Sequence, residues 1–192
     1  MKVRAYRQVA RAISTEETRT AILDAVDAIF LPHPGRALSL EAVAERAGTT
    51  VQTVLRHFDS KAGLIEAAAR RGFEEVKSGR DEVPVGDLEA IVAYLVRHYE
   101  EMGPMVLRML TVEHEVPEVA RIIQRGRELH RTWVQRVLAP LLKQTEGPER
   151  RRRLAMLIGA TDVLMWRILR IEQGLSQRDY QRSVLELLEA FR

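Results

Sequence analysis

The chain has 192 residues, 30% of them charged, with a formal net charge of +3 and no cysteine. A chain of this length forms one compact domain or two small ones, and the lack of cysteine excludes disulfide frameworks, thiolate metal sites and cysteine nucleophiles, in keeping with a reducing cytoplasm. Because no apolar run of about 18 residues occurs and no apolar segment follows the basic N-terminus, we expect neither a membrane-spanning helix nor a secretory signal.

The first 14 positions carry basic residues and no acid. The basic residues are Lys2, Arg4, Arg7 and Arg11. Two interpretations stay open for this segment, a solvated tail or an arm that contacts DNA phosphates. We treat residues 1–14 as a basic N-terminal arm and expect the first helix to begin at Ser14 or Thr15, because Ser14 and Glu17 have the spacing of a capping box.

The first predicted helix has an apolar face and a sharp end. Ile22, Val26 and Ile29 recur on one side, at the spacing of an amphipathic helix. Pro32 and Pro34 follow, and proline cannot supply the amide that a helix interior needs. We therefore expect this helix to end near residue 31.

Two short helices joined by a glycine are predicted next. Ser39 is the N-cap of one helix, which Gly48 ends, and Thr50 is the N-cap of another that runs to about His57. A fourth helix follows the Asp59-Ser60 break and covers 61–78. This spacing is typical of a helix-turn-helix, whose second helix lies in the major groove of DNA. An ordinary three-helix packing unit has the same spacing and remains an alternative.

The third helix begins with polar residues and no acid, as a surface facing phosphates requires. Gln52 offers a paired donor and acceptor to an adenine edge, and the methyl groups of Val51 and Thr53 match a thymine methyl. Thr50, Arg56 and His57 are better placed to contact phosphates, and phosphate contacts position a protein on DNA without specifying the base sequence. The predicted DNA-contacting residues are Ser39, Thr49, Thr50, Val51, Gln52, Thr53, Arg56, His57 and Lys61.

Longer helices are predicted beyond a boundary at 79–86. They cover 87–102, 104–113 (after an interruption at Gly103-Pro104), 117–142, 149–173 and 176–191. No segment shows the sustained alternation of a half-buried strand. We predict an all-α fold of about nine helices in three parts: the arm at 1–14, a helix-turn-helix domain at 15–60 and a helical regulatory and dimerisation domain at 61–192, with the helix 61–78 connecting the two.

Four segments together resemble the N-terminal domain of the tetracycline-repressor (TetR) family over about residues 15–70. They are Ala21–Ala25, Phe30, Ser39–Gly48 and His57–Leu64. The resemblance implies that Ser39, Thr50, His57 and Lys61 contact phosphates, that Gln52 and Thr53 face bases, and that Phe58 belongs to the core. One position departs from the family: Leu55 replaces a tyrosine that contacts the DNA backbone. Arg56 compensates for it electrostatically, or Leu55 turns into the core.

The resemblance also implies a homodimer, joined by the last two long helices of each chain. A palindromic operator fits such a dimer, because its two heads lie about one DNA turn apart. The alternative is that these helices bury their faces within one chain. The predicted interface residues are Gly159, Ala160, Leu164, Ile168, Val184, Leu187, Leu188 and Phe191.

An effector pocket among the middle helices is the third implication. Methionine adapts to irregular apolar ligands, and tryptophan adds a flat face with one donor. The same residues at helical spacing also serve as ordinary core. The candidates are Tyr94, His98, Met102, Met105, Met109, Trp133, Met165 and Trp166. We expect a repressor, released from its operator by a small molecule through a population shift, with no cofactor and no bound metal.

Three rival functions have less support. An enzyme built on His98, His114, Glu115 and His130 lacks any HExxH or GxSxG element. A relative that no longer binds DNA and acts through protein contacts is favoured only by Leu55. A membrane-surface protein would rely on the basic arm, which has no aromatic anchor besides Tyr6.

Overall fold

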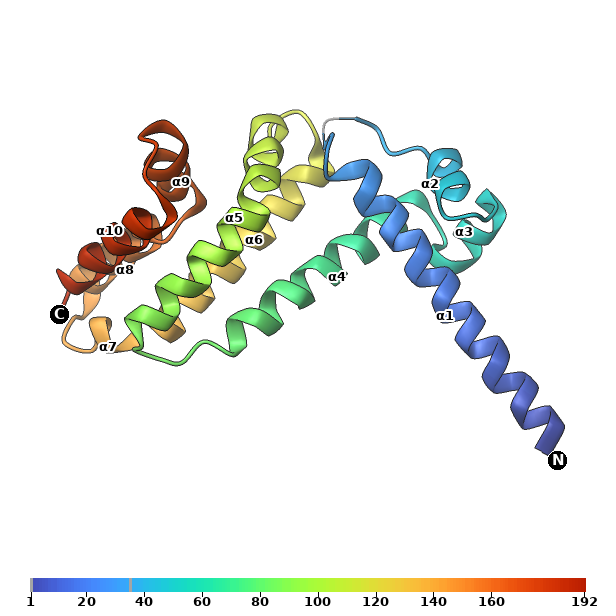
Figure 1. The fold of residues 1–192 in the computed structure, drawn as a ribbon, viewed down its shortest axis with the longest axis horizontal. Helices are drawn as coiled ribbons and strands as arrows, with labels where there is room; N and C mark the ends of the chain where they lie inside the picture. The colour runs from blue at the N-terminus through green and yellow to red at the C-terminus, as the bar shows by residue number, and fades with distance from the viewer. Residues whose placement is uncertain (1, 35) are drawn as a thin grey trace. The chain divides into compact units, whose positions relative to one another are not determined.

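The computed structural model describes residues 2–34 and 36–192, with side chains from Thr15 onward. All regular structure in this part of the chain is helical, as expected, and it comprises ten α-helices and one π-helical segment (Figure 1). The chain divides into two compact units, Met1–Phe73 and Glu74–Arg192. None of the described helices is long and apolar enough to cross a membrane.

The first unit contains three helices and most of a fourth. They are α1 (Lys2–Phe30), α2 (Leu40–Arg46), α3 (Val51–Phe58) and α4 (Lys61–Asp81). Ile22, Val43, Val54, Phe58 and Leu64, which come from all four helices, are buried together in one core. A core shared by four helices fixes the angle at which α3 is presented.

An arginine pairs with two carboxylates across this unit. Arg71 of α4 donates to Asp24 at 2.7 Å and also pairs with Asp27, both on α1. Two bonds from one planar guanidinium restrict both the distance and the orientation of α4 against α1.

The N-terminal boundary of α1 corrects the sequence prediction. The helix begins at Lys2 and not at Ser14, so Ser14 lies inside the helix instead of capping it. The segment 2–14 contains neither glycine nor proline, and its alanines, arginines and glutamine are good helix formers. The side chains of Lys2, Arg4, Arg7 and Arg11 lie outside the described residues.

The second unit packs its helices around one apolar core. They are α5 (Leu88–Val112), α6 (Pro117–Val137), α7 (Ala139–Leu142), α8 (Gly147–Ala160), α9 (Val163–Trp166), the π-helical segment η1 (Arg167–Glu172) and α10 (Gln177–Glu189). Ile91, Leu95, Val134, Leu157 and Leu188 are fully buried in it. The last eight residues of α4 belong to this unit too.

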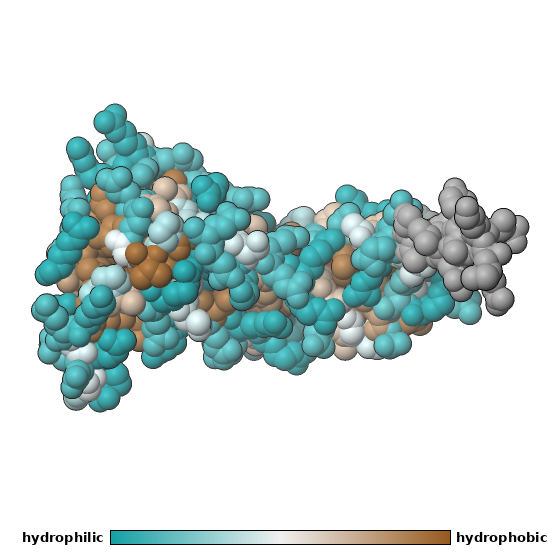
Figure 2. Space-filling model, turned by 90° about the horizontal axis from the view of Figure 1, so that it is seen from below, coloured by the Kyte–Doolittle hydropathy of each residue, from teal (hydrophilic) through white to brown (hydrophobic). Residues whose placement is uncertain are grey.

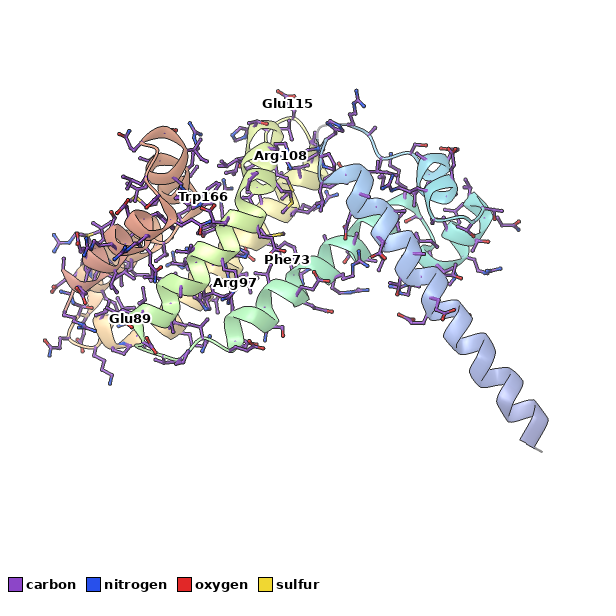
Figure 3. All side chains as sticks on the ribbon, in the orientation of Figure 1. Phe73, Glu89, Arg97, Arg108, Glu115 and Trp166 are labelled. Carbon is purple, nitrogen blue, oxygen red and sulfur yellow. The ribbon has the colours of Figure 1, made fainter. Side chains whose placement is uncertain are left out.

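The interruption expected at Gly103-Pro104 is wrong, because α5 is continuous through both residues. A proline inside a helix costs one backbone hydrogen bond, and packing maintains the helix here. Gly103 lies against Trp166, labelled in Figure 3, so closely that a Cβ would be 2.6 Å from its Cζ3 atom. The glycine is therefore a contact surface for α9 and not the end of a helix.

The single helix expected over 149–173 is also wrong. It breaks at Thr161 and Asp162, where Asp162 adopts an extended backbone (φ −82°, ψ 156°) and its carboxylate accepts the Leu164 N–H at 2.9 Å. The Thr161 hydroxyl donates to the Leu157 carbonyl at 2.8 Å, a bond that bends helices. The chain turns at this point and brings Trp166 back onto α5.

Candidate DNA-binding interface

The turn between α2 and α3 is built by two caps and one glycine. The Ser39 hydroxyl accepts the Ala42 N–H at 3.2 Å, and the Thr50 hydroxyl accepts the Thr53 N–H at 3.2 Å. Between them Gly48 has φ +63°, a conformation that a Cβ resists. These three residues bring α3 to the surface with its amino end free.

The amino end of α3 exposes polar groups and buries apolar ones. Val54 and Phe58 are buried in the core of the unit, whereas Gln52 and Arg56 are exposed. The remaining predicted contacts are exposed or half-buried, namely Ser39, Thr49, Thr50, Val51, Thr53, His57 and Lys61. The structure therefore leaves all nine predicted DNA-contacting residues accessible to a ligand.

Ser39 has an acidic neighbour. Its hydroxyl donates to the Glu41 carboxylate at 2.6 Å, and this hydrogen bond lowers the pKa of Glu41, with a smaller contribution from the charge of Lys61. A carboxylate held beside Ser39 repels a phosphate. A phosphate contact by Ser39 therefore requires Glu41 to turn away, whereas Lys61 is free of any described ion pair.

Leu55, at the position where the family has tyrosine, is 37% exposed. The alternative that it turns into the core is therefore wrong, because Val54 and Phe58 already fill the inward face of α3. An exposed leucine beside exposed Arg56 leaves an apolar spot on the surface of α3.

The end of α3 has two structural features that sequence reasoning missed. Arg19 of α1 donates to the His57 carbonyl at 3.3 Å and places its guanidinium 4.5 Å from the centre of the Phe58 ring. Asp59 follows with φ 61° and ψ −38°, and its N–H donates to the Leu55 carbonyl at 2.7 Å. Arg19 lies 38 residues from His57 in the sequence, so no local pattern could have indicated the contact.

The predicted effector residues separate into two places in the second unit. The Tyr94 ring stacks on His98 and packs against Trp133, with centroids 5.5 Å apart in both pairs. Trp166 instead packs against Tyr99 and donates to Glu100 at 2.9 Å. Met109 is buried, and three further candidates are half-buried, namely Met102, Met105 and Met165.

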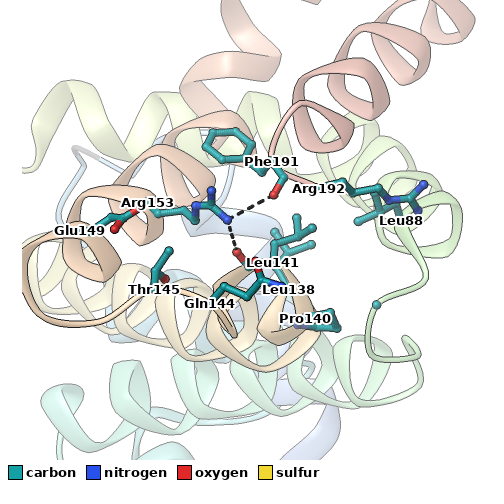
Figure 4. A pocket seen from close by; sticks show the side chains of 11 residues that line it. Leu88, Leu138, Pro140, Leu141, Gln144, Thr145, Glu149, Arg153, Phe191 and Arg192 are labelled. Carbon is teal, nitrogen blue, oxygen red and sulfur yellow. Dashed lines mark hydrogen bonds between the residues drawn. The ribbon is translucent and has the colours of Figure 1, made fainter.

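A pocket of about 510 Å³ lies elsewhere in the second unit, beside α7, α8 and the C-terminus (Figure 4). Arg153 crosses it and donates to the carbonyls of Leu141 at 2.8 Å and Phe191 at 3.3 Å. None of the predicted effector residues lines this pocket.

The predicted interface residues are also divided. Ala160, Val184 and Leu188 are buried inside the chain's own core. The others remain accessible: Gly159, Leu164, Ile168 and Leu187 are exposed, and Phe191 is half-buried. Met156 and Ile171, which sequence reasoning missed, are exposed by 51% and 61%.

The sequence of the first unit matches a known family of proteins. The family described as bacterial regulatory proteins, tetR family, matches residues 22–68, from the core of α1 through both short helices into α4. Residues 22–68 therefore form a DNA-binding domain of the TetR type. Its helix-turn-helix is the part that the match covers in full.

Relatives and solved structures extend the comparison. The HTH-type transcriptional repressor KstR of Rhodococcus jostii is 32% identical over 102 residues, which are 50% of this chain and 47% of that protein. The chain spans about half the length of the curated relatives it matches.

Two solved structures share the fold over nearly the whole chain. The SmeT–triclosan complex has a TM-score of 0.65 at 17% identity and covers 90% of both chains. NalD, the secondary repressor of the MexAB-OprM multidrug efflux pump in Pseudomonas aeruginosa, has a TM-score of 0.61 at 20% identity over 93% of this chain and 96% of that one.

Proposed function

We propose that this chain is a homodimeric transcriptional repressor of the TetR family in the cytoplasm that binds a palindromic operator and releases it when a small molecule binds. The observation that carries the proposal is the amino end of α3. There Gln52 is exposed between Thr50, which caps the helix, and Thr53, whose N–H the cap accepts. A polar, acid-free helix end held by a rigid turn suits base contacts in a major groove.

The named relatives support the direction of regulation. KstR and NalD are both called repressors, and SmeT was solved with triclosan. We therefore propose that this chain represses transcription and that a small organic molecule releases it from DNA.

An apolar surface on the second unit supports a dimer. Met156, Leu164, Ile168, Ile171 and Leu187, which come from α8, α9, η1 and α10, are all more than 40% exposed. Figure 2 shows apolar side chains reaching the surface over the C-terminal helices of the second unit. A second copy would bury this surface and supply the second head that a palindrome needs.

Selection of bound DNA from a random pool tests the proposal directly. We expect the purified chain to enrich a palindrome whose half-sites are centred about one DNA turn, roughly 34 Å, apart. A variant with Gln52→Ala and Thr53→Ala serves as the control and should enrich a degenerate site. If the unmodified chain enriches no palindrome, the proposal is wrong.

A further inference from the structure

A buried arginine of the second unit has no counter-ion. The side chain of Arg80, near the end of α4, is only 5% exposed. None of the ion pairs formed by the described residues includes it. Its Nε and Nη1 atoms are buried without a hydrogen-bond partner. A buried unpaired charge is strongly destabilising, and buried donors without partners are rare in proteins.

The neighbours of Arg80 are aromatic and uncharged. Its Nη2 atom lies 3.4 Å from His130 Nδ1, and its guanidinium is 5.2 Å from the centre of the Trp133 ring. Burial raises the pKa of the Tyr94 hydroxyl, and the charge of Arg80 opposes that rise. These contacts hold the guanidinium in place but neutralise none of its charge.

Both nearby histidines are neutral. Burial, and next the charge of Arg80, lower the pKa of His130 to about 3 and that of His98 to about 4. His130 is also hydrogen-bonded through Nε2 to the Thr161 hydroxyl at 3.1 Å. Arg80 is therefore a fixed positive charge among groups that stay uncharged at neutral pH.

We propose that Arg80 binds the carboxylate of the effector, with Tyr94, His98 and Trp133 packing against a planar apolar body. This deepens the proposed function, because it rests on the second unit being the effector domain. The N–H groups of Nε and Nη1 have no partner, and each can donate a charge-assisted hydrogen bond to a carboxylate oxygen. Aromatic rings around them suit a flat ligand. A neutral effector would leave the charge of Arg80 unpaired.

The first test needs no ligand. Arg80→Met replaces the charged group by an apolar one of similar length. If Arg80 is an unpaired site for an anion, the ligand-free variant melts at a higher temperature than the unmodified chain, because a buried charge is removed. If Arg80 is a structural anchor, the variant melts lower, and the proposal is overturned.

The second test uses matched probes on the full chain. 2-Naphthoate, indole-3-acetate and decanoate are each compared with the corresponding neutral amide, and binding is measured by calorimetry. We expect at least one carboxylate to bind at least about tenfold more tightly than its amide, because charge-assisted hydrogen bonds are the stronger ones. Arg80→Met should abolish that preference. Arg97→Gln is the control: Arg97 (Figure 3) is exposed, its guanidinium lies 5.7 Å from the centre of the Tyr94 ring, and the variant should retain the preference.

The outcomes separate the two proposals. If no carboxylate is preferred, or if Arg80→Met retains the preference, the Arg80 assignment is wrong even when the chain enriches a palindrome. If an Arg80-dependent preference is found but no palindrome is enriched, the regulator proposal fails and the anion site stands.

Discussion

Gln52 and Lys61 contribute two different kinds of DNA contact. Gln52 is exposed at the amino end of α3 and Lys61 at the amino end of α4. We expect Gln52→Ala to relax the sequence preference at one or two base pairs, because a base-edge contact is lost. Lys61→Ala should weaken binding to all sequences alike and reduce the salt slope by about one. Titrations at several salt concentrations measure both effects, and an unchanged slope for Lys61→Ala would exclude the phosphate contact.

Leu55 offers a gain-of-function test at the same surface. Its side chain is 37% exposed on α3, where the family has a tyrosine that contacts the DNA backbone. We expect Leu55→Tyr to raise the affinity for operator and non-operator DNA about 2- to 10-fold, the effect of one added hydrogen bond. Leu55→Phe adds the ring without the hydroxyl and should leave affinity unchanged. Equal effects of the two variants would contradict a phosphate contact.

The burial of Arg80 could not be predicted from the sequence. Tyr94, His98 and Trp133 were selected for their side-chain types, and the structure brings them together. Arg80 and His130 complete the cluster but lie 50 residues apart in the sequence. The residues around Arg80 are polar, so the sequence pattern predicts that its side chain is exposed. The burial of that charge is a property of tertiary packing, which periodicity does not record.

The helices were best predicted where a cap or a glycine marks the boundary. Ser39, Gly48, Thr50 and Ser176 mark boundaries at the expected places. The exceptions are Ser14, which lies inside α1, the continuity of α5 through Gly103, which packs against Trp166, and the α8–α9 break, where Thr161 and Asp162 bond to the backbone. A local rule about proline at 104 predicted the wrong outcome, because Gly103 is packed against that ring.

A pair of glycines tests the packing explanation. Gly103→Ala should lower the free energy of unfolding by about 1–3 kcal/mol, because its Cβ would overlap the buried Trp166 ring. Gly72→Ala in α4 meets no atom within 4 Å and should raise that free energy by up to about 1 kcal/mol through helix propensity. Urea unfolding of both variants measures the difference. If both stabilise, Gly103 is not a close contact.

At the scale of the whole molecule, the proposed dimer depends on the apolar surface of the second unit. Leu164→Glu should leave the helix content unchanged, because Leu164 is 47% exposed, but should shift the chain to a monomer and abolish tight operator binding. Val85→Glu is the matched control, since Val85 is 53% exposed outside the C-terminal helices. Sedimentation analysis at several concentrations decides the matter, and a dimeric Leu164→Glu variant would place the interface elsewhere.

Asp59 has a consequence for how the protein tolerates mutation. It is exposed, yet its backbone has φ 61°, a region where β-branched and bulky residues are strained and only glycine, asparagine and aspartate are common. The test is a library in which each exposed position between Thr50 and Lys61 is randomised and the variants are sorted only for folding. We expect position 59 to accept the fewest amino acids, with glycine and asparagine enriched there. Few amino acids are usually accepted at positions whose side chains bind a ligand or pack in the core. At position 59 the backbone geometry alone would restrict the accepted amino acids, although the side chain faces solvent.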